Sequence, residues 1–372
     1  MSRSPIYSFI IFILILSCKD SDNHKNSKEN ELEIKINSIN IKTDTLAKFT
    51  YGVFTFKSEK DLELITYNNT SHSIEFFNLN SKNLSKRIIL KSDGPKAIGN
   101  VTGLYYHNQD SIFISSRGSI NIINESYSKE SNPNLLALIE DYNINFEPLF
   151  NQHFRLYYIP EIKSIPIYNL YFDPKSKISA ETEQISFFDL NDLKITTLDY
   201  FQTEPIESDI EYGFLNYPTI SKPFDGKFLV NQIYSPMTYQ YNSKTQEFTE
   251  VISADKIYHE KNKNPEDWVP HAVESNFYNQ LEKLNDNIFT RILWKETEHK
   301  PKENGFLKKE YILQIFNKNF DIIDELKLPK NTYFSYTWFV ANNKLYIQAG
   351  HPNYKYISEE ELIIHEIELK EK

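Results

Sequence analysis

The stretch that decides the fold is Gln184-Ile-Ser-Phe-Phe-Asp-Leu-Asn-Asp-Leu-Lys-Ile-Thr-Thr-Leu-Asp-Tyr-Phe201. It holds two short runs of aromatic and β-branched residues, which favour strands, on either side of an Asp-Leu-Asn-Asp turn. An aromatic residue directly before the Asn or Asp that begins a turn recurs at 73–82, 237–245 and 311–319, with a weaker copy at 120–124. Units that cannot each bury an apolar face must stack on their neighbours, so the pattern predicts a repeat architecture.

The rest of the body follows a strand pattern. From residue 32 onward, apolar residues alternate or run in short groups between Asn, Asp, Ser and Pro clusters, without a long helical period. Parsed in fours, the strands fill five sets and leave the last set one strand short, while 31–41 is a strand left over at the other end. Pairing the two closes a ring and removes its open edges. We therefore predict an all-β fold, a six-bladed β-propeller over residues 32–372 closed by the N-terminal strand.

Two alternatives stay open for the architecture, seven blades or paired β-sandwiches. The parse makes 154–158 the innermost strand of the third blade, and 274–284 is the best candidate for a short helix.

The first residues predict an address in the cell. The apolar run 6–16 is too short to span a bilayer comfortably, which indicates a signal peptide over residues 1–17. It ends in Leu16-Ser-Cys18, which resembles a bacterial lipobox, and Cys18 is the only cysteine. We expect Cys18 to carry a lipid, the alternatives being an unlipidated signal peptide or a free buried thiol. Residues 18–31 are nearly devoid of apolar side chains and should form a disordered tether.

The charge of the chain limits its partners. Lys and Arg number 41 against 51 Asp and Glu, a formal net charge of −10. This balance argues against nucleic acid and against adhesion to anionic lipid through a basic patch, so the membrane contact is the lipid on Cys18. Asp20 and Asp22, just past the cysteine, resemble export signals of some Bacteroidota lipoproteins. They favour a cell-envelope location at the outer membrane, periplasmic or surface-exposed.

A family resemblance can be named on three features. The lipobox, the strand repeats and the loop Lys91-Ser-Asp-Gly-Pro-Lys-Ala-Ile-Gly99 leading into Leu104-Tyr-Tyr106 resemble the Bacteroidota lipoproteins that carry domain of unknown function 4221. In this copy Lys-Ala-Ile stands where Gly is commoner. The resemblance implies a propeller-like lipoprotein and brings no activity with it.

Motifs with defined chemistry are few. The sequence holds no G-x-S-x-G, no phosphate-binding loop, no H-E-x-x-H and no cysteine-based metal spacing. We therefore predict no catalytic residue, no metal and no cofactor.

A propeller does restrict where a ligand could bind. Loops that join the fourth strand to the first, and the second to the third, share one face around the channel mouth. That face receives a Gly-Pro turn, a cation before a glycine that would suit carboxylates, and the longest non-repeating loop, 254–274. The candidate ligand-binding residues are Gly94, Pro95, Arg117, Arg155, Trp268, His271, Trp294 and His351. For each, a turn or core role is the competing interpretation.

These observations lead to two functional hypotheses. The first is an anchored binding or scaffold module for a protein, a peptide or a glycan, favoured by the anchor, the tether and the aromatic-rich body. The alternative is a propeller hydrolase or lyase with a site at the channel mouth.

Overall fold

The computed structural model describes residues 32–44, 53–58, 61–94, 97–116, 118–127, 129–131, 133–135, 147–150, 154–170, 185–198, 218–253, 268–333, 337–356 and 360–371. The predicted signal peptide, the tether with Cys18, Pro95, Arg117 and residues 254–267 lie outside these ranges. No helix in the described ranges is long and apolar enough to cross a membrane.

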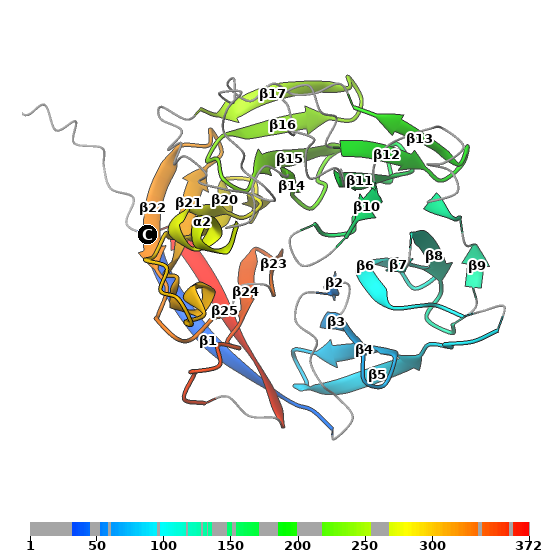
Figure 1. Ribbon diagram of the computed structural model, residues 1–372, viewed down its shortest axis with the longest axis horizontal. Helices are drawn as coiled ribbons and strands as arrows, with labels where there is room; N and C mark the ends of the chain where they lie inside the picture. The colour runs from blue at the N-terminus through cyan, green and yellow to red at the C-terminus, as the bar shows by residue number, and fades with distance from the viewer. Residues whose placement is uncertain are drawn as a thin grey trace, which may run out of the picture.

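The described strands form groups of four that follow one another along the chain and stand around a common centre (Figure 1). Within each group the strands are antiparallel, and the first strand is innermost. The first three groups are β2 (Phe54–Ser58), β3 (Leu62–Asn68), β4 (Ser73–Asn78) and β5 (Asn83–Ile89); β6 (Val101–Asn108), β7 (Ser111–Ser116), β8 (Ser119–Ile123) and β9 (Lys129–Ser131); β10 (Glu147–Leu149), β11 (Ser164–Leu170), β12 (Ile185–Asp189) and β13 (Lys194–Thr197).

The fourth and fifth groups complete the consecutive series. The fifth has two short inner strands, which both pair with the same neighbour. Their members are β14 (Pro218–Ile220), β15 (Lys227–Gln232), β16 (Thr238–Asn242) and β17 (Glu247–Ile252); β18 (Phe277–Tyr278), β19 (Glu282–Lys283), β20 (Ile288–Trp294), β21 (Tyr311–Asn317) and β22 (Ile322–Lys327). The helix α2 (Trp268–Glu274) and the 3₁₀ helix η3 (Gly305–Lys308) flank this fifth group.

The ring closes through the two ends of the chain. β23 (Trp338–Ala341), β24 (Lys344–Gln348) and β25 (Glu361–Glu371) supply three strands, and β1 (Leu32–Lys42) supplies the fourth. β1 pairs with β25 along its whole length, from Leu32 opposite Glu371 to Lys42 opposite Glu361. A single parallel pair, Lys42 with Asn83 of β5, joins this group to the first. The predicted all-β propeller, closed by the N-terminal strand, is confirmed.

The recurring aromatic–Asn pattern marks the turn from the third strand to the fourth. Asp189 Oδ1 accepts hydrogen bonds from the backbone N–H groups of Asn191 and Asp192, at 2.7 and 3.0 Å. The equivalent side chains that cap the turns of other groups are Asn78, Asn124, Asn242 and Asn317. The short carboxylate or amide replaces a backbone acceptor within the turn, which is why Asn and Asp recur there. The closing group needs no such turn, since its fourth strand is β1.

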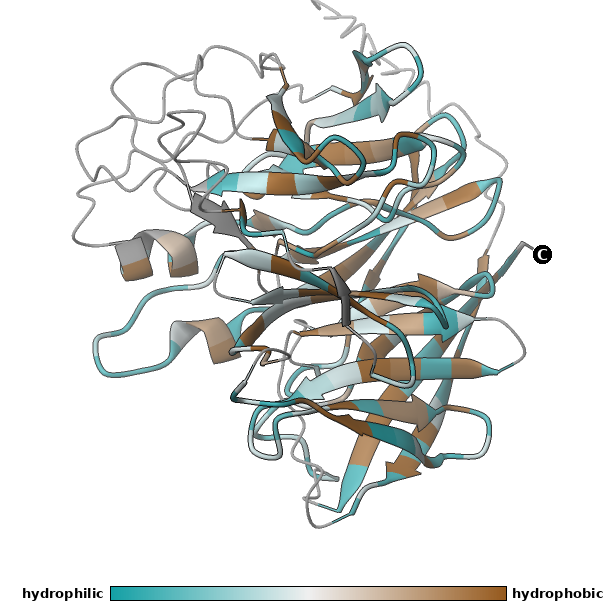
Figure 2. Cartoon of the chain, turned by 90° about the vertical axis from the view of Figure 1, so that its right-hand side faces the viewer, coloured by the Kyte–Doolittle hydropathy of each residue, from teal (hydrophilic) through white to brown (hydrophobic). Residues whose placement is uncertain are grey.

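Hydrophobic and hydrophilic residues alternate along many of the strands, as Figure 2 shows, and the buried members fill the space between groups. Aromatic pairs such as Phe187 with Tyr241 and Phe54 with Phe339 lie between neighbouring groups, with ring centroids 5.6 and 6.1 Å apart. This is the use of the abundant aromatic residues that a stack of sheets requires.

One expected strand is wrong, and one candidate helix is absent. The segment 154–158 is not a strand; β10 takes the innermost place and pairs with β11. Phe154, Leu156 and Tyr157 are buried without strand alternation because the segment runs inside the ring, where both of its sides are covered. The segment 274–284, the candidate for a short helix, forms β18 and β19 instead, and α2 ends at Glu274. Pro270 is tolerated because it lies in the first turn of α2.

Candidate functional site

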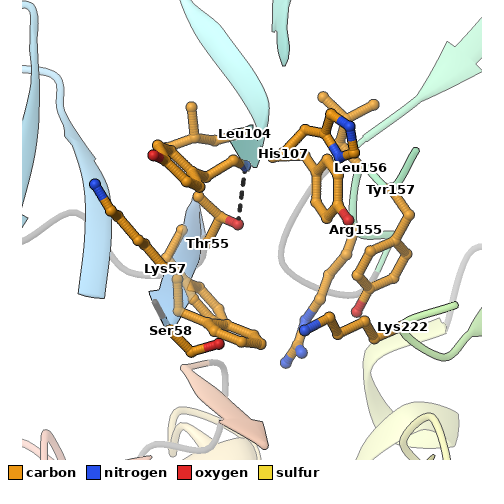
Figure 3. A pocket seen from close by; sticks show the side chains of 13 residues that line it. Thr55, Lys57, Ser58, Leu104, His107, Arg155, Leu156, Tyr157 and Lys222 are labelled. Carbon is orange, nitrogen blue, oxygen red and sulfur yellow. Dashed lines mark hydrogen bonds between the residues drawn. The ribbon is translucent and has the colours of Figure 1, made fainter. Parts of the chain in front are cut away.

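A pocket with a cavity volume of about 180 Å³ lies at the centre of the ring (Figure 3). It lies where the innermost strands of the first two groups meet the segment before β11 and the turn after β14. Its lining residues are 54–58 of β2, 104–107 of β6, 155–157 and Lys222.

The pocket runs along the whole of β2 and reaches toward the ends of β6 and β14, where first strands connect to second strands. β2 contributes residues up to its last, Ser58, and β6 up to His107, next to its end. Lys222 follows the end of β14. First strands end at their connections to second strands, whereas the expected face carries the fourth-to-first and second-to-third loops.

A glycine sets the position of the segment that carries Arg155. A Cβ added to Gly103 of β6 would lie 3.0 Å from Phe150 Cβ and 3.1 Å from Leu156 Cβ. Only a residue without a side chain lets the segment pack this closely against β6. Leu156 is thereby held at the pocket wall, with Arg155 and Tyr157 on either side of it in the chain.

This close approach gives a first testable prediction. Gly103→Ala should destabilise the protein by about 1–3 kcal/mol, because a methyl group must displace two packed side chains. Urea denaturation followed by tryptophan fluorescence would measure it. Thr102→Ala, at a neighbouring position where the side chain is partly exposed, is the control. Equal stability of the two variants would mean that the segment can shift without cost.

The Arg155 guanidinium is fixed on all sides. It lies 4.8 Å from the Phe54 ring centroid and 5.1 Å from that of Trp338. With the Gln280 amide turned so that its oxygen faces the guanidinium, Nη1 donates at 2.8 Å and Nε at 3.1 Å. The group is a cation held rigidly in the wall, with cation–π contacts on its faces.

A buried carboxylate stands behind this wall. Glu282 of β19 accepts hydrogen bonds from the Tyr157 hydroxyl at 3.3 Å and the Lys222 backbone N–H at 3.0 Å, and its Oε1 lies 3.9 Å from Arg155 Nη1. Burial raises the pKa of Glu282, and the positive charge of Arg155 opposes that effect. Burial also raises the pKa of Tyr157 well above its ordinary value. Glu282 thus joins three elements at the pocket floor.

Two lysines line the pocket, and their pKa values are shifted in opposite directions. Lys222 Nζ lies 4.3 Å above the Phe56 ring, and among the described residues no acceptor receives a hydrogen bond from it. Burial lowers the pKa of Lys222, although the charge of Glu282 opposes this. Lys57 Nζ is paired with Glu125 at 3.1 Å. Its pKa is raised by Glu125 and Tyr106 in spite of burial. In Figure 3 Lys222 points into the pocket and Lys57 away from it.

The other polar groups that line the pocket are uncharged. Burial lowers the pKa of His107 and raises that of Tyr105 to about 12, so both are neutral at pH 7. Thr55 Oγ1 accepts a hydrogen bond from the Tyr106 backbone N–H at 3.2 Å. In the described part of the chain, no cluster of three His, Cys, Asp or Glu side chains could hold a metal ion. The pocket therefore presents one accessible cation between aromatic walls.

Of the residues predicted from the sequence, Arg155 lines this pocket. Gly94 lies in a turn with φ +77°, a conformation that favours glycine. Trp294 is buried between Phe277 and Tyr311, with ring centroids 5.6 and 5.5 Å away. Pro95 and Arg117 lie outside the described residues, as do the side chains of Trp268 and His271, whose backbone is in α2.

His351 is buried with protein partners. Its Nδ1 accepts a hydrogen bond from the Asn353 backbone N–H at 3.0 Å, which leaves Nε2 as the donor to Leu307 O at 2.9 Å. These two bonds tie the loop after β24 to η3.

Sequence reasoning missed Lys222, His107 and the aromatic walls. The available signal was the turn Ser221-Lys-Pro-Phe-Asp-Gly226, which follows a very short strand and places a cation next to a proline. A single lysine in a turn is too common to be singled out without knowledge of where the turn lies.

Fold and pocket define the class of protein: an all-β propeller with a small cationic and aromatic pocket in its channel. The chain belongs to the family of the domain of unknown function DUF4221, whose model matches residues 27–327. The predicted family is thereby confirmed. A member of the same family from Bacteroides vulgatus is similar in structure, with a TM-score of 0.77, 17% identity, and coverage of 93% of this chain and 100% of that one.

A second solved structure is a protein described as exported, from Bacteroides fragilis, with a TM-score of 0.58 and 11% identity over 91% of this chain and 95% of that one. At these identities the likeness shows the fold alone. None of the curated proteins compared matches the chain.

Proposed function

We propose that the protein is a binding module of the cell envelope, anchored by a lipid on Cys18, that takes a small ligand or one terminal group of a larger partner into its channel pocket. The observation that carries this proposal is Lys222. Its ammonium enters an aromatic-walled cavity and, among the described residues, has no acceptor. A half-buried ammonium without a hydrogen-bond acceptor is costly, and a ligand that supplies the acceptor removes that cost.

The size of the pocket limits what can enter. A cavity of about 150 Å³ holds a molecule such as benzene, and drug-sized ligands need about 300–1,000 Å³. At about 180 Å³ the pocket fits a single residue-sized group. A peptide or glycan partner would thus insert one terminal unit, with its remainder outside.

A blocking variant tests the binding function. Ligand-detected NMR with the chain from Leu32 onward would screen mixtures of monosaccharides, free amino acids, dipeptides, organic acids and amines. Ser58 is exposed at the pocket rim, so Ser58→Trp should close the mouth without disturbing the core. Lys244→Trp is the control, because Lys244 lies in an exposed turn and does not line the pocket. Absence of any signal that Ser58→Trp removes and Lys244→Trp keeps would contradict a binding role for this pocket.

A second candidate function is a hydrolase or lyase acting in the same pocket. It is favoured by the meeting of Lys222, Glu282 and Tyr157, three titratable groups with displaced pKa values, since such groups gather at catalytic sites. The two functions differ in one measurable result. A bound ligand recovered unchanged after prolonged incubation supports the binding module, and its conversion to products supports the enzyme.

The proposed lipid anchor predicts how a variant of Cys18 behaves in cells. Cys18→Ala should leave the membrane fraction or remain an unprocessed precursor, because several acyl chains contribute about 0.8 kcal/mol per buried methylene and a protein without them has no such anchor. Carbonate-washed membranes and the mature mass would be compared with Ser17→Ala, which keeps the cysteine. Membrane partitioning of Cys18→Ala like that of the wild type, with both proteins at the same mass and still carrying residues 6–16, would show that this run is an uncleaved anchor.

A further inference from the structure

The charges around Lys222 identify the kind of ligand that the pocket would take; this step rests on the binding function proposed above. The titratable and charged groups that line the pocket beside Lys222 are Arg155 and Tyr157 from the segment before β11 and His107 from β6, and the charge of Glu282 from β19 acts on Lys222 from behind the wall. Together with Lys222, this cluster holds two cations, Lys222 and Arg155, and one carboxylate, Glu282. On the far wall, Lys57 and Lys86 share the carboxylate of Glu125, at 3.1 and 2.9 Å. Each cluster holds one cation more than it holds anions.

The pocket is therefore positive in a chain whose formal net charge is −10. The excess charge of the second cluster lies with Lys86, which does not line the pocket. The excess charge of the first cluster lies at Lys222. Arg155 is capped by the Gln280 oxygen, which accepts from its Nε, Nη1 and Nη2, and its guanidinium lies over the Phe54 and Trp338 rings. One ammonium remains available for one anionic group.

The chemistry of the walls selects among anions. A phosphate or sulfate presents three or more oxygens and is bound best by several free N–H donors, whereas Lys222 is the lining cation whose side chain makes no hydrogen bond to the described residues. A carboxylate has one negative charge, and the apolar body that carries it can lie on aromatic rings. Phe56 lies beneath Lys222 Nζ, and Tyr105 and Leu104 also line the pocket. A body the size of a benzene ring matches the cavity volume.

We propose that the pocket binds a monocarboxylate on a compact apolar body, with the carboxylate paired to Lys222 Nζ and the body between Phe56 and Tyr105. The carboxylate can belong to a free organic acid or to the C-terminal residue of a peptide, and the two sources share this chemistry.

The electrostatics of Lys222 predict how binding depends on pH. Burial lowers the pKa of Lys222 in the empty pocket, and a carboxylate at Nζ would raise it again. Binding should therefore take up protons wherever the empty amine is partly neutral. By linkage the affinity falls as the pH rises through the pKa of the empty amine. Lys57 cannot give this effect, because Glu125 already keeps it protonated.

Isothermal titration calorimetry on the chain from Leu32 onward tests the proposal. Benzoate and 3-phenylpropionate are the free acids, glycyl-phenylalanine is the peptide, and benzamide, benzylamine and inorganic phosphate are the matched controls. We expect at least one carboxylate to bind about tenfold or more tightly than benzamide, the ratio that a charge-assisted hydrogen bond supplies. Benzylamine and phosphate should not bind. Preference for the free acids or for the dipeptide decides the source.

Variants and buffers make the test specific for Lys222. Lys222→Met keeps the apolar stem and should weaken the carboxylate about tenfold or more, whereas Lys57→Met should change it less than threefold. Lys222→Arg keeps the charge and should retain most of the binding. Titrations in two buffers of different ionisation enthalpy should give proton uptake in the wild type and none in Lys222→Arg.

The outcomes separate this proposal from the broader one. Equal affinity for benzoate and benzamide, or an unchanged affinity in a folded Lys222→Met protein, overturns the carboxylate site. Binding of a neutral sugar alone, blocked by Ser58→Trp, overturns it too and leaves the binding module standing. Failure of every class of compound in both experiments overturns both.

Discussion

A chain that begins at Thr43, without β1, is expected to lose its cooperative unfolding transition. β1 makes eleven register pairs with β25, and the backbone hydrogen bonds of such a ladder contribute roughly 5–15 kcal/mol in total. This range equals the whole stability of an ordinary domain, about 5–15 kcal/mol. The truncated protein would also expose the edge of β25, a template for pairing with other chains. Thermal denaturation by circular dichroism and size-exclusion chromatography would reveal a molten or associated protein.

The control for this experiment begins at Leu32 and lacks only the preceding residues. A synthetic peptide of residues 32–42, added in trans, should restore the transition if β1 acts as a separable closing strand. Arg87 provides a second fastening, because its guanidinium holds Asp44 just past β1 through two bonds of 2.8 and 2.9 Å. A truncated chain that melts within a few degrees of the control would show that the ring is stable while open.

Replacement of Glu282 by Ala should destabilise the protein by about 3–5 kcal/mol, the cost of leaving a buried charge without its partner. The Arg155 guanidinium then loses its nearest carboxylate, which lies 3.9 Å away in the native protein. The Tyr157 hydroxyl and the Lys222 N–H also lose their acceptor. Urea denaturation at pH 8 and pH 5 would measure the loss, with Glu250→Ala, on an exposed position of β17, as the control.

Replacement of the other partner, Arg155→Met, should give a stability that depends differently on pH. The variant keeps the Glu282 carboxyl, which can take up a proton. Burial raises the pKa of Glu282 in the folded protein above 4.5, its value in the unfolded chain. The folded state then binds the proton more tightly than the unfolded state, so stability increases as the pH falls through the folded pKa toward 4.5. Relative to the wild type, Arg155→Met should recover at pH 5 and Glu282→Ala should not. Equal deficits at both pH values would mean that the charge pair is not what holds these elements together.

The sequence carried the repeat and its closure because both depend on local chemistry. An aromatic residue before Asn78, Asp189, Asn242 or Asn317 reports a strand that ends in a capped turn, whatever the rest of the chain does. The closing group lacks this turn, and the sequence indicates that by a last set with one strand too few. The segment 154–158 was misassigned because apolar composition reports burial, and burial inside a ring is the same for a strand and for an irregular segment.

The pocket could not be predicted in the same way. Lys222, Arg155 and Glu282 come from three different groups, and their meeting depends on how far each innermost segment reaches along the channel. Periodicity indicates which face of a strand is buried and is silent on which end of the channel is open. Gly103 shows the difficulty, since its role is to lack a side chain where Leu156 approaches.

The register of β1 on β25 also bears on the connectivity of the chain. Leu32 stands opposite Glu371, so the first and last residues of the described body are neighbours across one ladder. A short linker between them would turn the closing pair into an ordinary hairpin, and the chain could then be opened at another surface turn, such as 301–303. Circular permutants of this kind would differ from the native protein in which group is completed last. The same ring could thus be assembled from several starting points.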